Sequence, residues 1–414
     1  MSPRRIIVIG AGAAGTMAAI FSAGTGAETL LLERTRDGGR KILISGGGRC
    51  NVLPSQLDET RFVTDSSPNT LRKLVRSWPL AEQIAFFERE VGIPLVEESE
   101  SRKMFPASHK ARDVRDGLLA LAKRRGASVF METHVTDVVR AGDRWSVILS
   151  GAPPIDADAV IVATGGLSVP TTGSDGTGLR VLEKLGHVIR PTYAALTPVV
   201  ASPSPFASLS GVSLSVNLTA TGRARAATAS GGFLFTHIGY SGPSVLDVSH
   251  VVVRSRADGE QPRARVTVRW TELGDDAWAE RLRPRGARTV MTAVRAELPD
   301  RLASALIDAA HVAPDRLLSE LPRDERLRLI EMLVRGTLPW TSDEGYRKAE
   351  VTGGGLDLSE IDPRTMESRR HPGLYLCGEV LDAFGPIGGY NFLWAWATGR
   401  AAGLGAARTV RDDA

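Results

Sequence analysis

Cysteine is scarce in this chain of 414 residues, which contains only Cys50 and Cys377. The two lie too far apart in sequence to form a CxxC redox pair, and two thiols cannot supply the four cysteine ligands of a structural zinc site. We therefore expect neither a thiol relay nor a metal site. The favoured interpretation is that both are buried as small apolar side chains, and such sparse cysteine usage fits a reducing cytoplasm.

Long apolar runs are missing as well. No stretch reaches the roughly 18 apolar residues that a membrane span requires. Arg4 and Arg5 precede the apolar run Ile6–Ile9 as in a signal peptide, but this run is too short and leads directly into a glycine-rich turn. Basic runs are absent too: the net charge is +4, and the arginines are spread along the chain. The sequence therefore predicts neither a membrane nor a nucleic-acid partner.

Glycine, by contrast, is abundant, with 43 residues gathered in short loops. The first cluster, Gly10–Gly15, matches G-x-G-x-x-G between an apolar strand, Ile6–Ile9, and a helix of small residues, Ala14–Ala23. In such a βαβ unit the glycines let the backbone approach a pyrophosphate at the helix N-terminus. The next strand, Glu28–Glu33, ends in an acid placed to bind ribose hydroxyls. Because Glu33 would repel a 2′-phosphate, FAD or NAD is favoured over NADP as the tightly held dinucleotide.

Further strands follow along the chain. Ala159–Ala163 and Leu374–Cys377 are typical of buried parallel strands, whereas Val129–Val139 and Trp145–Leu149 predict a small meander. Lys348–Thr352 is expected to form a strand that ends before three glycines.

The middle of the chain has a different pattern of apolar and polar residues. From residue 191, apolar and polar residues alternate as in half-buried antiparallel strands, and from Arg285 to Arg335 the pattern is helical. We predict an α/β fold in which a FAD-binding Rossmann-like (glutathione-reductase-type) domain is interrupted by an insert. The expected domain comprises residues 1–190 and 351–414. The insert, 191–350, would contain a β-barrel at about 191–272 and a helical subdomain at about 273–345.

Two glycine motifs after late strands narrow the choice of cofactor. The sequences ATGG at 163–166 and GE at 378–379 resemble the FAD domain of the glutathione-reductase-like flavoproteins. The segment Gly39–Asn51, GRKILISGGGRCN, begins an ordered set of motifs that ends in GGYN at 388–391, and this set resembles the BaiN/YhiN-type flavoproteins, sometimes labelled aminoacetone-oxidase-like. The resemblance runs from residue 4 to about 405. It implies FAD, a β-barrel-plus-helical insert and reduction linked to NAD(P)H. Because the sequence contains no second dinucleotide fingerprint, we expect NAD(P)H to bind transiently. One family member is associated with reducing the C=C bond of oxidised bile acids.

These motifs define the expected cofactor site. Arg40, Lys41 and Arg49 place three cations beside the nucleotide fold, where they can neutralise a pyrophosphate or line the flavin. Glu379 is expected to accept hydrogen bonds from ribityl hydroxyls, and the helix that begins near Gly388 is expected to face the flavin. The complete set of expected FAD-binding residues is Gly10, Ala11, Gly12, Ala14, Gly15, Glu33, Arg34, Arg40, Lys41, Ser45, Gly46, Gly48, Arg49, Cys50, Asn51, Val135, Ala163, Thr164, Gly165, Gly378, Glu379, Gly388, Gly389, Tyr390, Asn391 and Phe392.

The expected reaction is reduction of an electron-poor C=C bond, or a related acceptor, in a small molecule. His237 and Tyr240 are candidate proton donors, although a capping histidine and a buried tyrosine are the favoured explanation of these residues. Three other functions stay open: an amine oxidase that uses oxygen, an RNA-modifying flavoprotein, and an FAD-binding regulator without catalysis. The sequence leaves open whether the protein is a monomer or a homodimer.

Overall fold

The computed structural model describes residues 3–408. The ends of the predicted first domain, residues 1–2 and 409–414, lie outside the described residues. The chain divides into two compact units, one containing the residues up to Thr192 and those from Val351 onward, and the other Tyr193–Glu350. The sequence placed the first boundary two residues earlier, at 190/191.

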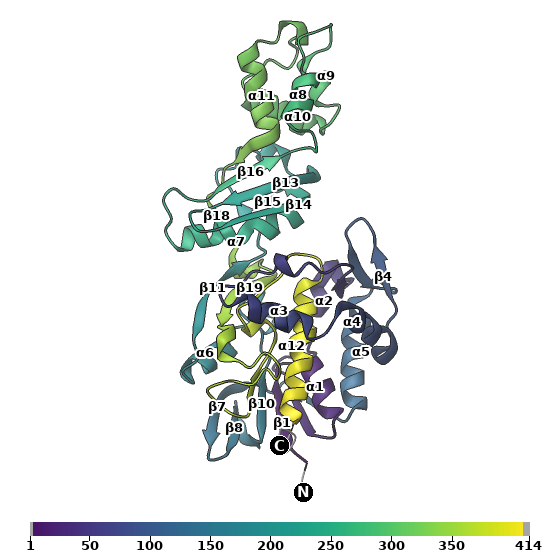
Figure 1. The fold of residues 1–414 in the computed structure, drawn as a ribbon, viewed down its shortest axis with the longest axis vertical. Coiled ribbons are helices and arrows are strands. Elements are labelled where there is room, and N and C mark those ends of the chain that lie inside the picture. The colour runs from purple at the N-terminus through teal and green to yellow at the C-terminus, as the bar shows by residue number, and fades with distance from the viewer. Residues whose placement is uncertain (1–2, 409–414) are drawn as a thin grey trace. The chain divides into compact units, whose positions relative to one another are not determined.

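A five-stranded parallel sheet is the centre of the first unit (Figure 1). Ile7 of the central strand is completely buried and lies between Val160 and Leu30 of its two neighbours, as expected for a sheet covered on both faces. Since the strands are parallel, their carboxyl ends meet at one edge, where open α/β sheets bind ligands. The strand order is β20 (Leu374–Leu376), β10 (Ala159–Val162), β1 (Arg5–Ile9), β2 (Glu28–Leu32) and β6 (Ser128–Phe130).

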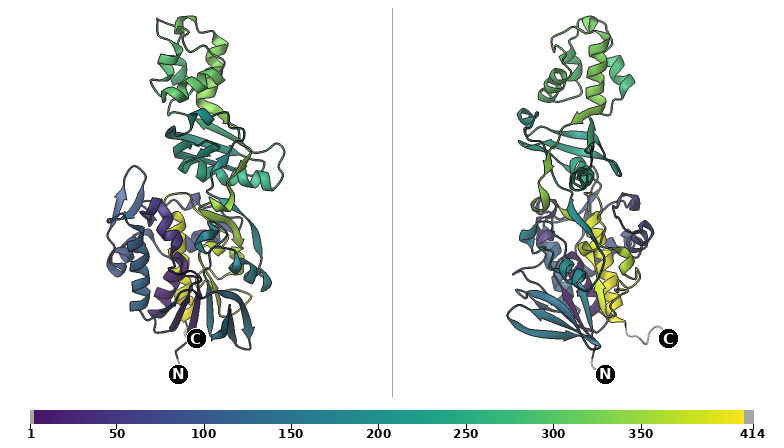
Figure 2. Two further views of the ribbon diagram at one scale, coloured as in Figure 1. Left: turned by 180° about the vertical axis from the view of Figure 1, so that it is seen from behind. Right: turned by 90° about the vertical axis from the view of Figure 1, so that its left-hand side faces the viewer.

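The first and last helices of this unit pack against each other. Helix α12 (Tyr390–Ala407), yellow in Figures 1 and 2, lies along α1 (Ala13–Ala23), drawn in purple. Gly399 and Gly403 lie one turn apart on the contact face. A Cβ atom at these positions would lie 2.3 Å from the Ala14 carbonyl oxygen and 2.4 Å from that of Ala18. The close approach explains why glycine occupies both positions of the closing helix.

The predicted strand Val129–Val139 is wrong as a single element. Residues 128–130 form β6 at the edge of the parallel sheet, Glu132 turns the backbone with φ 53°, and β7 then begins a separate three-stranded meander. The meander consists of β7 (Val135–Ala141), β8 (Arg144–Leu149) and β9 (Ala152–Ala157). Another three-stranded sheet contains β3 (Leu53–Pro54), β5 (Lys103–Pro106) and β4 (Leu95–Glu98). The other helices of the unit are α2 (Arg40–Ile44), α3 (Pro68–Arg76), α4 (Leu80–Phe86), α5 (Ala111–Arg124) and α6 (Thr177–Lys184).

Two strands carry the chain between the units. It leaves the first unit along β11 (Ile189–Ala195) and returns along β19 (Val351–Leu356), and these strands form a two-stranded sheet. The three glycines that were expected to end the returning strand lie inside it. Gly354 explains this difference, because a Cβ atom there would lie 2.2 Å from the Pro191 carbonyl oxygen. The backbone pairing leaves no room for side chains.

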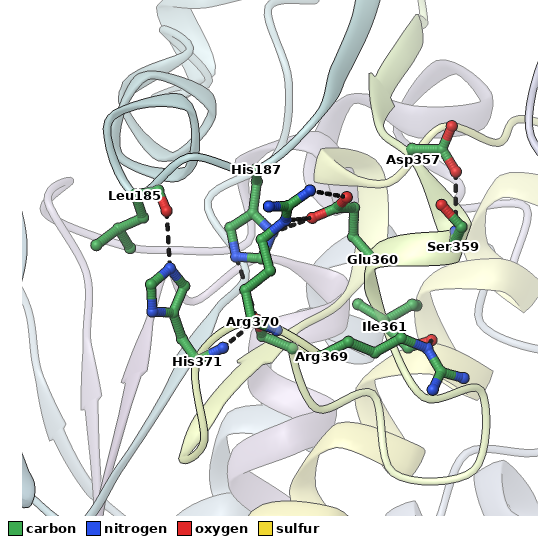
Figure 3. Close-up of polar contacts among 10 residues, drawn as sticks. Leu185, His187, Asp357, Ser359, Glu360, Ile361, Arg369, Arg370 and His371 are labelled. Carbon is green, nitrogen blue, oxygen red and sulfur yellow. Dashed lines mark hydrogen bonds and ion pairs between the residues drawn. The ribbon is translucent and has the colours of Figure 1, made fainter.

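A buried polar network joins the segment before β11 to the loop after β19 (Figure 3). His187 Nδ1 lies 2.9 Å from the Glu360 carboxylate, and His187 Nε2 lies 3.2 Å from Ser368 Oγ. Arg370 forms a two-pronged ion pair with Glu360, and His371 Nε2 lies 2.7 Å from the Leu185 carbonyl oxygen.

His187 lies between a serine and a glutamate, as the histidine of a hydrolase triad does, but the surroundings of these residues indicate a structural role. Ser368 Oγ already accepts hydrogen bonds from the backbone N–H groups of Arg370 and His371, and the residue is only 5% exposed. Burial lowers the pKa of His187 despite the nearby Glu360 carboxylate. The network therefore holds a neutral imidazole between two segments of the first unit.

The second unit is a curled antiparallel sheet followed by a helical subdomain. Leu338 and Ser342 belong to its two edge strands but are only four residues apart, so they lie within about 14 Å. A flat sheet of seven strands would separate its edges by about 29 Å. The sheet must therefore curl towards the predicted barrel, although no hydrogen-bonded ladder joins the two edges within residues 193–350. The strand order is β17 (Gly336–Leu338), β16 (Arg265–Arg269), β13 (Ser213–Thr221), β14 (Ala226–Phe235), β15 (Gly239–Ser241), β12 (Val199–Val200) and β18 (Ser342–Asp343).

The alternation that predicted these strands is explained by burial on one face. Val216 and Leu218 of β13 point into the core of the unit with Val266 and Val268 of β16. Helix α7 (Pro243–Ala257) packs against β13 and β14. The helical subdomain consists of α8 (Asp275–Arg281), α9 (Val290–Val294), α10 (Asp300–Ala309) and α11 (Arg323–Arg335).

Candidate functional site

The turn between β1 and α1 has the geometry that the glycine pattern predicted. A Cβ atom at Gly15 would lie 1.8 Å from the Gly10 carbonyl oxygen, so this position admits glycine alone. Gly10 has φ 102° and lies against the backbone of Ala163 at the end of β10. At Gly12, in contrast, a Cβ atom would meet no atom within 4 Å. Helix α1 begins there without a side-chain cap or an acidic residue in its first turn, which leaves its N–H groups available to an anion.

Glu33 lies beyond the end of β2 and is only 7% exposed. One carboxylate oxygen accepts a hydrogen bond from Ala11 N at 2.8 Å, and the other accepts from Thr35 N at 2.7 Å and Thr35 Oγ1 at 2.6 Å. The acid therefore supports the fingerprint turn directly. Because an ionised carboxylate offers about four lone-pair sites, acceptor capacity remains for a ribose hydroxyl.

The loop that follows contains backbone conformations that favour glycine. Gly46, Gly47 and Gly48 all have positive φ values, and so does Cys50, with φ 61°. Cys50 is completely buried, and burial raises the pKa of its thiol to about 12. Ser45 stabilises the turn, since its carbonyl oxygen accepts from Cys50 N at 3.0 Å.

The expected cations of this region are each paired with an acid. Arg34 pairs with Asp175, and Arg40 lies 2.8 Å from Asp37. Arg49 lies 2.9 Å from Glu98, and its guanidinium group stacks 4.3 Å above the Phe105 ring. These arginines are partly exposed and thus available for further contacts.

Lys41 is the cation held most firmly. Its Nζ donates to Glu379 Oε2 and to Ser168 Oγ, both at 2.6 Å. Glu379 Oε1 accepts from Ser168 Oγ at 2.6 Å and from Thr352 N at 2.9 Å. Burial on its own would raise the pKa of Glu379, but the charge of Lys41 and these hydrogen bonds lower it overall.

The carboxyl end of β10 completes this side of the site. Gly165 has φ 74°, and a Cβ atom at Gly166 would lie 2.3 Å from Thr352 Oγ1. Thr164 Oγ1 is buried and has no hydrogen-bond partner within residues 3–408. After β20, Gly378 has φ 78° and donates its N–H to Thr398 Oγ1 at 3.0 Å.

The N-terminus of α12 is joined to the same loop. With its amide oriented to satisfy both neighbours, Asn51 accepts from Gly389 N at 3.0 Å and donates to the Leu53 carbonyl oxygen at 3.2 Å. Asn391 binds the backbone N–H and carbonyl of Gly385, both at 2.9 Å, so its side chain holds the preceding loop. Tyr390 donates to the Gln56 carbonyl oxygen, and Phe392 stacks on Trp396 at 5.3 Å.

These residues fit a bound FAD on structural grounds. The open space above Gly12 and the uncapped start of α1 suit a pyrophosphate, and Glu33 lies at the end of the neighbouring strand. The other glycine turns gather at the same edge of the sheet, after β10 and β20.

Comparison with known proteins gives the family. A model described as the HI0933-like protein Rossmann domain matches residues 4–405, nearly the whole chain. The chain belongs to this family. It is a flavoprotein oxidoreductase with a Rossmann-type FAD-binding domain, as the sequence motifs predicted.

Three relatives are similar over nearly their full lengths. The 3-dehydro-bile acid delta(4,6)-reductase of Clostridium scindens is 30% identical over 409 residues, which cover 97% of this chain and 99% of that relative. The ribosomal RNA dihydrouridine synthase of Escherichia coli is 30% identical over 404 residues, which cover 95% of each chain. A protein of the same name from Haemophilus influenzae is also 30% identical, over 417 residues that cover 97% of this chain and 98% of that relative.

A solved structure supports the fold alone. The 3-ketosteroid delta1-dehydrogenase from Sterolibacterium denitrificans, in complex with 1,4-androstadiene-3,17-dione, aligns with a TM-score of 0.54 over 98% of this chain and 100% of that chain. The identity is 12%, too low to carry substrate or mechanism. No helix in the described part of the chain is long and apolar enough to cross a membrane. Across residues 3–408, no group of three or more histidine, cysteine and acidic side chains could hold a metal ion.

The two expected proton donors lie in the second unit, in contrasting surroundings. His237 is exposed in the turn between β14 and β15. Tyr240 is 2% exposed, among Phe233 and Phe235, and burial raises the pKa of its hydroxyl. These surroundings favour a packing role for Tyr240.

Sequence reasoning missed several supporting residues and gave Val135 a role that the structure leaves open. Val135 is 8% exposed at the start of β7. Ser168 and Thr352, both completely buried, were missed, as was Arg115 of α5, which donates to the Asp37 carbonyl oxygen at 3.0 Å. Ser168 and Thr352 could have been noticed as polar residues beside glycine motifs of buried strands. The residue that both contact, Glu379, lies far away in sequence.

Proposed function

We propose that this protein is an FAD-dependent reductase that uses NAD(P)H to saturate a C=C bond conjugated to a carbonyl group. The observation that carries the proposal is the full-length similarity to relatives named for such chemistry, a bile acid reductase and two dihydrouridine synthases. A 3-oxo-Δ4 steroid and a uracil ring share an alkene made electron-poor by an adjacent carbonyl. When bound, FAD supplies two-electron transfer between a nicotinamide and such an alkene.

The balance of the reaction assigns work to the protein. The carbon β to the carbonyl receives a hydride that originates from NAD(P)H, and the α carbon receives a proton. The chain must therefore bind the cofactor, exclude water and supply an acid. His237 is the more accessible of the two candidate donors, because it is exposed whereas the hydroxyl of Tyr240 is enclosed in the core of its unit.

RNA is a second candidate substrate. The spread of arginines led us to expect no nucleic-acid partner, whereas the names of two relatives favour one. The sequence contains a stretch, 281–295, with five arginines and no acid. The structure weakens its charge, because Arg281 pairs with Glu297 at 2.8 Å, while Arg283 and Arg285 pair with Glu280 at 3.5 and 3.0 Å.

The experiment is reoxidation of the reduced protein without oxygen. Holoprotein reduced by NADPH or NADH is mixed with a 3-oxo-Δ4 steroid, with a uridine-containing RNA transcript, or with a control transcript that contains no uridine. We expect one substrate class to restore the oxidised flavin spectrum and to gain two hydrogen atoms by mass spectrometry. A flavin that stays reduced with both substrate classes, and is reoxidised only when air is admitted, would contradict the proposal.

A further inference from the structure

The ion pair between Lys41 and Glu379 joins segments 338 residues apart, at the edge of the sheet where the cofactor site is formed. Lys41 belongs to α2, whose preceding residue Gly39 donates its N–H to the Ala11 carbonyl oxygen at 2.9 Å. Glu379 follows β20 by three residues. The pair is therefore attached to the fingerprint turn on one side and to the last strand on the other.

The hydrogen bonds around the pair are distributed unevenly. Three donors reach Glu379, namely Lys41 Nζ, Ser168 Oγ and Thr352 N. Lys41 Nζ uses two of its three N–H groups, and no residue of the described chain accepts the third. Glu379 thus has most of its capacity occupied, whereas Lys41 has a donor to spare with its side chain 24% exposed.

We propose that Glu379 is a positioning residue that fixes the Lys41 ammonium group beside the flavin and partly neutralises it, so that the pair sets the reduction potential of bound FAD. The inference rests on the proposed function, because it assumes that FAD binds at this edge. It differs from the expected role of Glu379 as an acceptor for ribityl hydroxyls, in which the charge of Lys41 would play no part.

The physical reason is that reduction places negative charge on the flavin, and a nearby cation stabilises that charge. An ion pair has almost no net charge, so its effect is much smaller than that of a free cation. Glu379 carries its charge in this environment, since Lys41 and the three hydrogen bonds lower its pKa. Removing the charge of Glu379 should consequently raise the flavin potential, and removing the charge of Lys41 should lower it.

The test measures the midpoint potential of bound FAD in four proteins: wild type, Glu379→Gln, Lys41→Met and the double variant. Glu379→Gln keeps an oxygen acceptor for Ser168 and Thr352 but leaves Lys41 uncompensated, so the potential should rise. Lys41→Met should lower it, and the double variant should return towards wild type. We expect each single shift to correspond to at least a tenfold change in the reduction equilibrium, about 30 mV for a two-electron couple.

A charge control excludes a general electrostatic effect. Lys184→Met removes one positive charge from an ion pair with Asp137 at the surface, where the lysine side chain is 64% exposed, and screening should leave the potential unchanged. Shifts of the same sign in both single variants, or potentials that all equal wild type, would overturn the inference while leaving the proposed function intact. A wild-type protein that binds no FAD would instead contradict the proposed function.

Discussion

Replacing two glycines of the fingerprint turn by alanine should change two different quantities. Substitution of Gly15 should lower the stability of the fold, whereas substitution of Gly12 should weaken the binding of FAD. Gly15→Ala would place a methyl group 1.8 Å from the Gly10 carbonyl oxygen and 3.1 Å from the Ala163 side chain. Backbone cannot move away cheaply, so the overlap should cost about 3 kcal/mol or more. Alanine regains about 1 kcal/mol of helix propensity. We expect Gly15→Ala to lose at least about 2 kcal/mol of unfolding free energy.

Gly12→Ala is the matched variant, because nothing lies within 4 Å of the added methyl group. Its φ of −78° suits alanine, and the loss of a glycine N-cap should cost only about 0.5–1 kcal/mol. The methyl group would nevertheless project into the space assigned to the pyrophosphate. We expect the dissociation constant for FAD to rise at least tenfold, equivalent to about 1.4 kcal/mol.

Chemical denaturation of the FAD-free proteins and fluorescence titration with FAD measure the two quantities separately. If Gly12→Ala bound FAD as tightly as wild type, the pyrophosphate would not lie against this turn. An FAD-free Gly15→Ala protein as stable as wild type would show that the close packing of the turn is wrong.

Three further perturbations have defined outcomes. Glu33→Gln removes charge from hydrogen bonds worth about 1.5–3 kcal/mol each, so denaturation should show a loss of at least about 2 kcal/mol together with weaker FAD binding; unchanged values in both would leave Glu33 without a role. The pKa of His187 is lowered in the fold by burial and that of Glu360 by Arg370, so the unfolded chain binds more protons and stability should fall as the pH drops below about 6.5. His187→Gln should flatten the pH 5–6.5 part of that curve in thermal melts, and an unaltered slope would exclude His187 as its cause. Tyr240→Phe removes a buried hydroxyl that has no hydrogen-bond partner in the described chain, so stability should hold or rise by about 1 kcal/mol, and a large loss of turnover would instead identify Tyr240 as the proton donor.

Much of the parallel-sheet domain could be predicted because its signals are local. The strand Ile6–Ile9, the glycine turn and Glu33 lie within one βαβ unit, and each has a direct steric or hydrogen-bonding reason visible in the sequence. A closing helix was expected to begin near Gly388, and α12 begins at Tyr390.

The errors and omissions came from partners distant in sequence. The three glycines after Thr352 were expected to end the strand, but they lie inside β19, which pairs with β11, a strand about 160 residues earlier. Glu379 was expected to accept hydrogen bonds from ligand hydroxyls, whereas in the structure it accepts one from Lys41, which lies near the opposite end of the chain. No periodicity within a local window encodes either contact.

The central claim is that electrons flow from a pyridine nucleotide through bound FAD to an electron-poor alkene. The most direct measurement mixes holoprotein with NADPH, with NADH and with a small amine such as aminoacetone, each without oxygen, while the flavin spectrum is recorded. The account predicts that at least one pyridine nucleotide bleaches the oxidised flavin band and that the amine does not. Bleaching by the amine alone, with hydrogen peroxide appearing when air is admitted, would contradict the account and identify the protein as an amine oxidase.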